Sequence, residues 1–253
     1  MIKQIPNIIT SLNLLCGCVA ILFAVSGDLV TAAFFVFFGI FFDFFDGLAA
    51  RLLKAQSEIG LQFDSLADVI TSGLAPAVVM VQLFSEATLG LPFTFSIEES
   101  ETMLWSAGQF SYWPLVGLLI AVASAYRLAK FNVDTRQTTS FIGLPTPANA
   151  MLILSIPLIL HFQYSLEAES VLLNKWFLLG LTILSCFLLN SEIKLFGLKF
   201  KSWDFKSNVK RYVFLALCII AILLLQYIAI PVIILLYIVL SLLWKERTPE
   251  RIT

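Results

Sequence analysis

The sequence predicts an all-α integral membrane protein with about eight transmembrane helices. Three observations support this: a strongly apolar composition, apolar stretches long enough to cross a bilayer, and an uneven distribution of basic residues between them. Hydrophobic residues make up 59% of the 253, charged residues only 13%, and the mean hydropathy is +0.93. Soluble domains usually carry about 25% charged residues. The basic residues are scattered between apolar segments, so we expect no nucleic-acid partner.

Each predicted helix is an apolar stretch that approaches the ~20 residues needed to span a bilayer. In chain order the stretches cover residues 7–25, 29–53, 61–84, 112–131, 146–164, 173–190, 211–226 and 229–244. The last two are short and are separated only by residues 226–231. We therefore expect them to form a tight helical hairpin.

The charges between these stretches predict the orientation. With the N-terminus in the cytoplasm, every Lys and Arg except Lys175 falls on the cytoplasmic side, as the positive-inside rule expects. The opposite side instead collects acidic residues, namely Asp28, Glu86, Glu98, Glu99, Glu101, Glu167 and Glu169. We therefore expect a multi-pass protein of the cell (inner) membrane with both termini in the cytoplasm.

Four aspartates lie close together in the sequence in strongly apolar surroundings. Asp43 and Asp46 are three residues apart, so they share one helix face. Asp64 and Asp68 are four apart and share another. An ionised carboxylate costs ~2.5–3.5 kcal/mol at the centre of a membrane helix, so the group needs a cation. Oxygen ligands alone favour Mg²⁺, Mn²⁺ or Ca²⁺ over zinc or copper. The predicted orientation places this metal site near the cytoplasmic surface.

These aspartates resemble the signature of the CDP-alcohol phosphatidyltransferase family, D-x-x-D-G-x-x-A-R-x8-G-x-x-x-D-x-x-x-D. The chain matches all eight fixed positions, at Asp43, Asp46, Gly47, Ala50, Arg51, Gly60, Asp64 and Asp68. The resemblance implies transfer of a phosphatidyl group from CDP-diacylglycerol to an alcohol, with release of CMP. It also implies that the four aspartates bind one or two Mg²⁺ or Mn²⁺ ions and that Asp68 is the base. Ca²⁺ is a further candidate for a bound ion.

The remaining signature residues are the candidates for binding CDP-diacylglycerol. Gly47 and Gly60 have no side chain, which lets a nucleotide approach the backbone closely. Ala50 has only a methyl side chain and so also leaves room for the nucleotide. Arg51 can offer a planar guanidinium to phosphate. Taken alone, Gly47 is better explained by helix packing, and Arg51 by anchoring at the membrane surface.

The family core of about six helices implies three parts. We expect the phosphatidyltransferase membrane domain over residues 1–190, a basic cytoplasmic loop over 191–210, and a C-terminal transmembrane hairpin and tail over 211–253. The basic loop is a plausible contact for anionic lipid headgroups. Family members are usually homodimers, which implies the same assembly here.

Further likeness points to L-serine as the acceptor. Segments 6–13, 64–77, 126–132 and 143–149 resemble the members of the family that use serine, and Val69 stands where relatives that use glycerol 3-phosphate usually have lysine. Serine carries a carboxylate and an ammonium group, so its pocket needs a cation and hydrogen-bonding groups. Arg127 and Lys130 are three residues apart and can face one site, and Asn132 can orient the substrate. Lys130 is explained as well by snorkelling to the membrane surface.

Other interpretations remain open at the level of the sequence. Glycerol 3-phosphate or an inositol-type polyol can replace serine as the acceptor in the same reaction. A secondary transporter also places acids inside a helical bundle, but such proteins have two related halves with interrupted helices. The aspartate pattern has no second copy in this chain. Ser65 is the hydroxyl nearest to the aspartates, and a covalent route would use it as the nucleophile.

Overall fold

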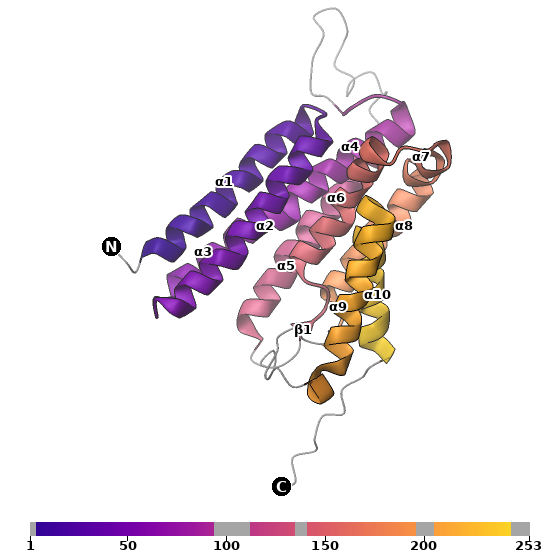
Figure 1. Cartoon of the computed structure of the whole chain (residues 1–253). Helices are drawn as coiled ribbons and strands as arrows, with labels where there is room; N and C mark the ends of the chain where they lie inside the picture. The colour runs from indigo at the N-terminus through magenta and orange to yellow at the C-terminus, as the bar shows by residue number, and fades with distance from the viewer. Residues whose placement is uncertain (1–3, 94–111, 135–140, 196–204, 244–253) are drawn as a thin grey trace, which may run out of the picture.

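The computed structural model describes residues 4–93, 112–134, 141–195 and 205–243, which form a bundle of α-helices (Figure 1). The helices are α1 (Ile5–Val25), α2 (Leu29–Leu52), α3 (Glu58–Asp68), α4 (Ala75–Leu89), α5 (Leu119–Val133), α6 (Thr146–Phe162), α7 (Leu166–Leu172), α8 (Lys175–Asn190), α9 (Phe205–Leu225) and α10 (Ala229–Leu243). Two short strands, β1 (Phe141–Ile142) and β2 (Lys194–Leu195), pair antiparallel. The predicted all-α architecture is confirmed. Several charges used in the orientation argument lie outside the described residues: Lys3, Glu98, Glu99, Glu101, Arg136, Lys199, Lys201, Lys245, Arg247 and Arg251.

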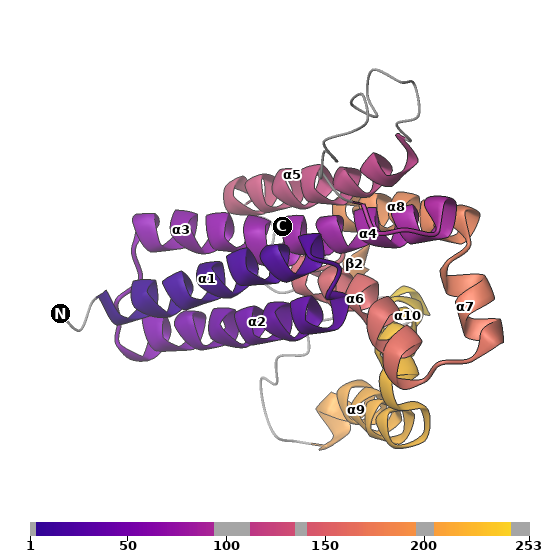
Figure 2. The ribbon, with the colours of Figure 1, turned by 90° about the horizontal axis from the view of Figure 1, so that it is seen from above.

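Helices α4 and α6 form the centre of the bundle. Most of α4 is buried, from Ala75 to Ser85, and α6 is buried over most of its length. Figure 2 shows the α1–α2 pair on one side of these helices and α8 on another. The outer helices instead expose large apolar side chains, such as Phe38, Phe41 and Phe44 on α2. A soluble protein would bury such residues, whereas a lipid-facing helix exposes them.

Five helical stretches of the described chain are long and apolar enough to cross a membrane: Ile5–Val25, Leu29–Leu52, Glu58–Leu89, Trp113–Val133 and Arg211–Leu243. The helices α7 and α8, bent by 57° relative to each other, would together make a sixth. The α6 helix is a shorter apolar helix. Each predicted stretch therefore coincides with a helix, and a multi-pass membrane protein is confirmed. The number of eight crossings stays a prediction.

The C-terminal hairpin has a tighter turn than the sequence suggested. A 3₁₀ turn, Gln226–Ile228, joins α9 directly to α10. Pro231 lies inside the first turn of α10, where its missing N–H has no intrahelical partner to lose. The two helices lie side by side (Figure 1).

A π-helical turn, Val69–Leu74, joins α3 to α4 directly after Asp68. The helices α1 and α2 approach this turn closely because each has a glycine there. A Cβ atom on Gly17 would lie 2.8 Å from the Cα of Thr71, and a Cβ on Gly39 would overlap the Thr71 methyl group. The Thr71 hydroxyl donates a 3.0 Å hydrogen bond to the backbone carbonyl of Asn13 on α1. The helices α1 and α2 are thus packed tightly against the segment that follows Asp68.

Candidate metal centre

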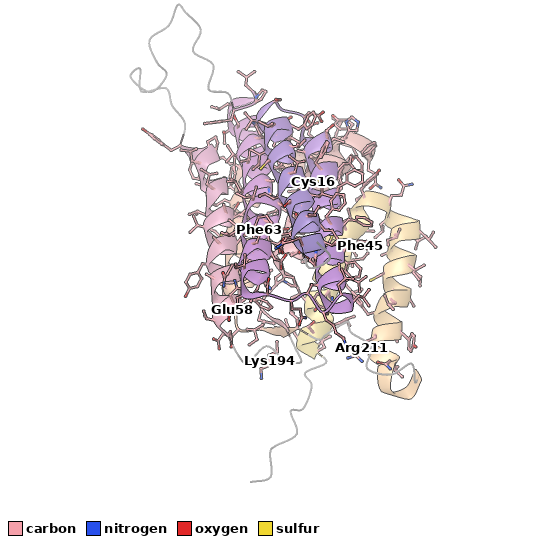
Figure 3. The ribbon with its side chains drawn as sticks, turned by 90° about the vertical axis from the view of Figure 1, so that its left-hand side faces the viewer. Cys16, Phe45, Glu58, Phe63, Lys194 and Arg211 are labelled. Carbon is pink, nitrogen blue, oxygen red and sulfur yellow. The ribbon has the colours of Figure 1, made fainter. Side chains whose placement is uncertain are left out.

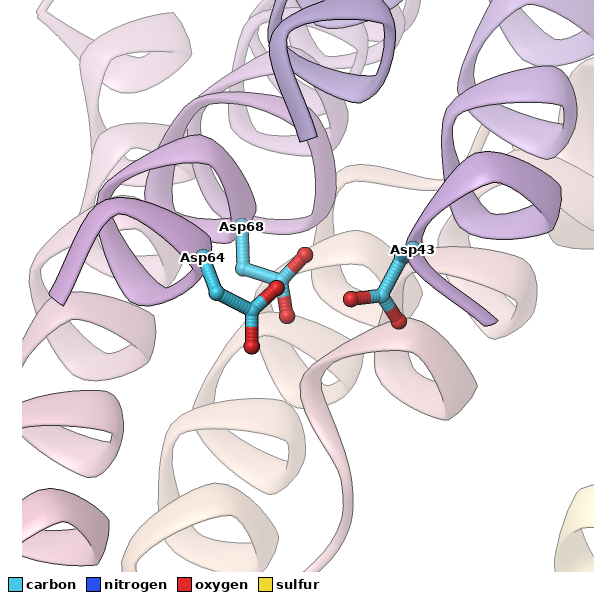
Figure 4. Close-up of side chains that lie close together, drawn as sticks. All are labelled: Asp43, Asp64 and Asp68. Carbon is cyan, nitrogen blue, oxygen red and sulfur yellow. The ribbon is translucent and has the colours of Figure 1, made fainter. Parts of the chain in front are cut away.

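Three aspartates from two helices converge at the contact between α2 and α3. Asp43 lies on α2, and Asp64 and Asp68 lie one helical turn apart on α3 (Figure 4). One carboxylate oxygen from each side chain can be chosen so that all three atoms lie within 4.8 Å of one another. Asp68 is 8% exposed, and the other two side chains are half-buried. The i,i+4 spacing on α3 therefore does bring two carboxylates to one face, opposite a third from α2.

The cluster has the properties of a binding site for a hard divalent cation. One oxygen of Asp64, Oδ1, is buried without a hydrogen-bond partner. Within the described chain, none of the three carboxylates forms an ion pair with a lysine or arginine. Three carboxylates this close together repel one another unless a cation lies between them. Their oxygen-only donor set suits Mg²⁺, Mn²⁺ or Ca²⁺.

The structure places Asp46 beside this group rather than in it. Its carboxylate is 4% exposed and accepts a 2.6 Å hydrogen bond from the Thr10 hydroxyl on α1. The i,i+3 spacing puts Asp43 and Asp46 on neighbouring parts of α2, but the contact with α1 holds the second carboxylate. That Asp46 is a metal ligand stays a prediction.

Asp68 is also held from α1. The Asn13 side-chain amide donates a 3.2 Å hydrogen bond to Asp68 Oδ1. Both Asn13 and Thr10 are buried polar residues on a mostly apolar helix, and both were missed as site residues. The signal was present, because two polar residues three positions apart in a lipid-spanning helix indicate a shared polar face.

A cleft of about 750 Å³ opens beside the aspartates. Its volume lies within the ~300–1,000 Å³ typical of ligand sites. It is lined by Pro6, Asn7 and Thr10 of α1, by Asp46, Gly47, Ala50 and Arg51 of α2, by Glu58, Gly60, Leu61 and Asp64 of α3, by Phe131 of α5, and by residues 55–57 between α2 and α3. All four residues predicted to bind CDP-diacylglycerol therefore line one cavity.

Gly47 and Gly60 differ in the space that surrounds them in the cleft. At Gly47 a Cβ atom would meet nothing closer than an Arg51 guanidinium nitrogen at 3.8 Å, so this wall is free to receive a ligand. At Gly60 a Cβ would lie 3.0 Å from the hydroxyl of Ser57, which caps α3 by accepting from the Gly60 amide. Arg51 itself is exposed, and its Nε donates to the Gly47 carbonyl at 2.9 Å.

The residues predicted to bind the acceptor are not gathered on one surface. Arg127 is 7% exposed, its Nε has no hydrogen-bond partner, and its charge interacts with that of Asp68. Lys130 forms an ion pair with Glu192 at 3.7 Å. Arg127 and Lys130 both line a cavity of about 10 Å³ against the end of α8, which has room for about one water molecule.

Asn132 lies apart from these two residues and contacts α3. Its side-chain nitrogen donates to the Ser65 hydroxyl at 2.9 Å and to Gln62 at 3.4 Å. Because Val133 ends α5, Asn132 is near the end of the helix and reaches the neighbouring helix there. That Arg127, Lys130 and Asn132 form one serine pocket stays a prediction.

The candidate site lies at the basic end of the bundle. Figure 3 shows Glu58, which lines the cleft, at the same end of the molecule as Lys194 and Arg211. The opposite end carries Asp28 between α1 and α2, Glu86 near the end of α4, and Glu167 and Glu169 in α7. Described charges are therefore distributed between the two ends as the orientation prediction expects.

Comparison with known proteins decides the family. The model of the family named CDP-alcohol phosphatidyltransferase matches residues 3–188, which is well over half of the chain. The chain belongs to this family. The matched region includes the three-aspartate cluster and all the residues that line the cleft, and it ends within α8.

Several curated proteins are similar to this chain, and three of them are all named CDP-diacylglycerol–serine O-phosphatidyltransferase. The Bacillus subtilis protein is 35% identical over 163 residues, covering 64% of this chain and 78% of that protein. The Helicobacter pylori J99 protein is 30% identical over 215 residues, covering 84% and 80%. The Mycobacterium tuberculosis H37Rv protein is 30% identical over 263 aligned positions, covering 98% of this chain and 82% of that protein.

Proposed function

We propose that this protein transfers the phosphatidyl group of CDP-diacylglycerol to the hydroxyl of L-serine, giving phosphatidylserine and CMP. The observation that carries the proposal is the convergence of Asp43, Asp64 and Asp68 beside a cleft lined by the other signature residues. Family membership supports the phosphatidyl transfer. The names of the three similar proteins support serine as the acceptor.

The cleft and the cluster suggest where each part of the substrate binds. The cytidine and pyrophosphate would occupy the cleft between α1, α2 and α3, with Arg51 at its edge to pair with phosphate. Asp43, Asp64 and Asp68 would hold the divalent ion, with Asp46 as a further ligand. When bound, this ion offsets the charge of the pyrophosphate and stabilises charge that develops at the attacked phosphorus.

The proposed mechanism is direct displacement. Asp68, fixed by Asn13, takes the proton from the serine hydroxyl. The serine oxygen bonds to the lipid-linked phosphorus, and the bond from that phosphorus to CMP breaks with its electron pair leaving on CMP. Arg127 is the proposed partner of the serine carboxylate, because its charge is buried near Asp68 and its Nε is unpartnered. The small cavity beside Lys130 cannot hold serine, so the carboxylate would approach from the side of the aspartates.

The proposed setting is the cytoplasmic leaflet of a cell membrane. The cleft opens at the basic end of the bundle, where the positive-inside rule places the cytoplasm. Serine would enter from water at this end, whereas CDP-diacylglycerol and the neighbouring lipids lie in the plane of the membrane. A homodimer, as is usual in the family, is part of the same proposal.

The test is acceptor-dependent release of CMP. The purified full chain in mixed micelles with CDP-diacylglycerol and Mn²⁺ should release CMP when L-serine is added. Glycerol 3-phosphate and inositol should give only background release. Asp68→Asn should abolish the reaction, whereas Asp28→Asn, a matched change at the opposite end that keeps a good helix cap, should not.

Two results would contradict the proposal at different levels. Equal CMP release with glycerol 3-phosphate or inositol would overturn serine as the acceptor while keeping the reaction. No CMP release with any of the three acceptors, from protein that binds Mn²⁺, would overturn the reaction itself.

A further inference from the structure

The α1 helix presents two buried polar side chains to the signature aspartates of other helices. Thr10 and Asn13 are three residues apart and therefore lie on one face of α1. They are 3% and 0% exposed. Asn7, one turn before Thr10, lines the cleft on the same side. This polar face of α1 runs from the cleft to the aspartates.

Thr10 holds one oxygen of Asp46. Its hydroxyl lies 2.6 Å from Asp46 Oδ2 and 3.0 Å from the Pro6 carbonyl of its own helix. The hydroxyl has one proton, and a hydrogen bond to a charged acceptor is the stronger choice. The bond to Asp46 engages Oδ2, one of the two carboxylate oxygens, and so restricts the orientation of the carboxylate.

Asn13 contacts both Asp68, directly before the π-helical turn, and Thr71 within it. Its side-chain nitrogen donates to Asp68 Oδ1 at 3.2 Å, and its backbone carbonyl accepts from the Thr71 hydroxyl at 3.0 Å. The close packing of Gly17 and Gly39 against Thr71 leaves little room for α1 to move relative to Asp68. A carboxylate with one oxygen held in this way has a defined orientation for the other.

We propose that Thr10 and Asn13 are positioning residues, with Thr10 orienting Asp46 for the divalent cation and Asn13 orienting Asp68 for the acceptor hydroxyl. Partners that hold metal-ligating carboxylates fix their orientation and tune their affinity. The part concerning the acceptor rests on the proposed reaction, and the part concerning the cation rests on the proposed metal site with Asp46 as a ligand. A purely structural role, in which both residues only satisfy buried polar groups, predicts a loss of stability and nothing more.

Paired substitutions separate these roles. Thr10→Val keeps the shape and removes the hydroxyl, and Thr10→Ser restores the hydroxyl without the methyl group. Asn13→Leu keeps the volume and removes the donor, and Asn13→Ser keeps a shorter donor if the leucine variant does not fold. Ser11→Ala is the matched control, because the neighbouring Ser11 hydroxyl is exposed and bonds only to the Asn7 carbonyl.

The first measurement is Mn²⁺ affinity, read from the electron paramagnetic resonance signal of free Mn²⁺ without substrate. Thr10→Val should weaken Mn²⁺ binding by roughly 10- to 100-fold, the usual effect of removing a partner of a metal ligand. Thr10→Ser should bind nearly as well as the parent, and Ser11→Ala should be unchanged. An unchanged Mn²⁺ affinity in Thr10→Val would overturn the role of Thr10.

The second measurement separates kcat from KM. Asn13→Leu, or Asn13→Ser to a smaller degree, should lower kcat by roughly 10- to 100-fold with little change in KM for CDP-diacylglycerol. A lower apparent melting temperature with an unchanged kcat would show that Asn13 is only structural. If the parent protein releases no CMP with serine, the proposed function fails, and the Mn²⁺ titration still decides the role of Thr10.

Discussion

The hydroxyl of Ser65 on α3 lies 2.9 Å from the side-chain nitrogen of Asn132 on α5 and 3.2 Å from its side-chain oxygen. Ser65 also bonds to the Leu61 carbonyl of its own helix at 3.2 Å. Although Ser65 directly follows Asp64 in the sequence, its hydroxyl is hydrogen-bonded to Asn132 on α5. A nucleophile needs a general base within hydrogen-bond reach, whereas the Ser65 hydroxyl contacts a side-chain amide and a backbone carbonyl.

We predict that Ser65→Ala retains most of the serine-dependent CMP release, because direct displacement does not use this hydroxyl. The substitution removes a hydrogen bond between α3 and α5 and should cost about 1 kcal/mol of stability. Steady-state kinetics of the purified variant give the test. Loss of activity in folded Ser65→Ala, together with serine-independent exchange of labelled CMP into CDP-diacylglycerol by the parent, would establish the covalent route instead.

The metal site should depend on each carboxylate of the cluster. Asp64→Asn removes one charge from a group with an unpartnered buried oxygen, so Mn²⁺ affinity and activity should both fall by more than roughly 100-fold. Removal of divalent ions by a chelator should abolish CMP release from the parent, and added Mn²⁺ should restore it. Full activity in the presence of the chelator would contradict the metal site. The control Asp28→Asn should lose activity in the chelator and regain it with Mn²⁺, as the parent does.

The fold and the cleft could be predicted because they depend on short-range patterns. Each apolar stretch predicted helical structure, although α7 lies outside all of them and the stretch 61–84 includes most of both α3 and α4. The spacing of Asp64 and Asp68 placed two carboxylates on one helix face. Gly47, Ala50, Arg51 and Gly60 lie in one cleft because they come from two consecutive helices joined by a short turn. Each of these inferences needs only the helical period and the short turn between α2 and α3.

The contacts of α1 could not be predicted in the same way. Thr10 and Asp46 are 36 positions apart, and Asn13 and Asp68 are 55 apart, so no local pattern shows that they meet. The π-helical turn after Asp68 also shifts the following residues around the helix axis, which a regular period does not anticipate. The contact of Asn132 with Ser65 on α3 is likewise long-range, since the two residues are 67 positions apart.

The packing around the π-helical turn gives a prediction about stability. Gly17→Ala would place a Cβ 2.8 Å from the Thr71 backbone, so the helices must separate, at a cost of typically 1–3 kcal/mol. The apparent melting temperature in detergent should fall, and activity should fall with it because Asn13 moves away from Asp68. Gly180→Ala is the matched control, because a Cβ there meets nothing within 4 Å. Equal melting temperatures for the two variants would contradict the close packing.

The last prediction concerns the acceptor pocket and compares two neighbouring cations of α5. Arg127 is buried near Asp68 with an unpartnered Nε, whereas Lys130 is paired with the exposed Glu192. If Arg127 binds the serine carboxylate, Arg127→Ala should raise the KM for serine by roughly ten- to 150-fold, from a charge-assisted bond of ~1.5–3 kcal/mol. Lys130→Ala should change it little, since exposed ion pairs contribute about 0–1 kcal/mol.

Arg51→Ala provides the opposite control, because Arg51 lines the cleft and not the cavity beside Arg127. It should raise the KM for CDP-diacylglycerol and leave that for serine nearly unchanged. Initial rates measured over a grid of both substrate concentrations give kcat and the KM for each substrate in every variant. If Arg127→Ala and Arg51→Ala both weakened CDP-diacylglycerol alone, Arg127 would belong to the nucleotide side, and the serine carboxylate would need another partner.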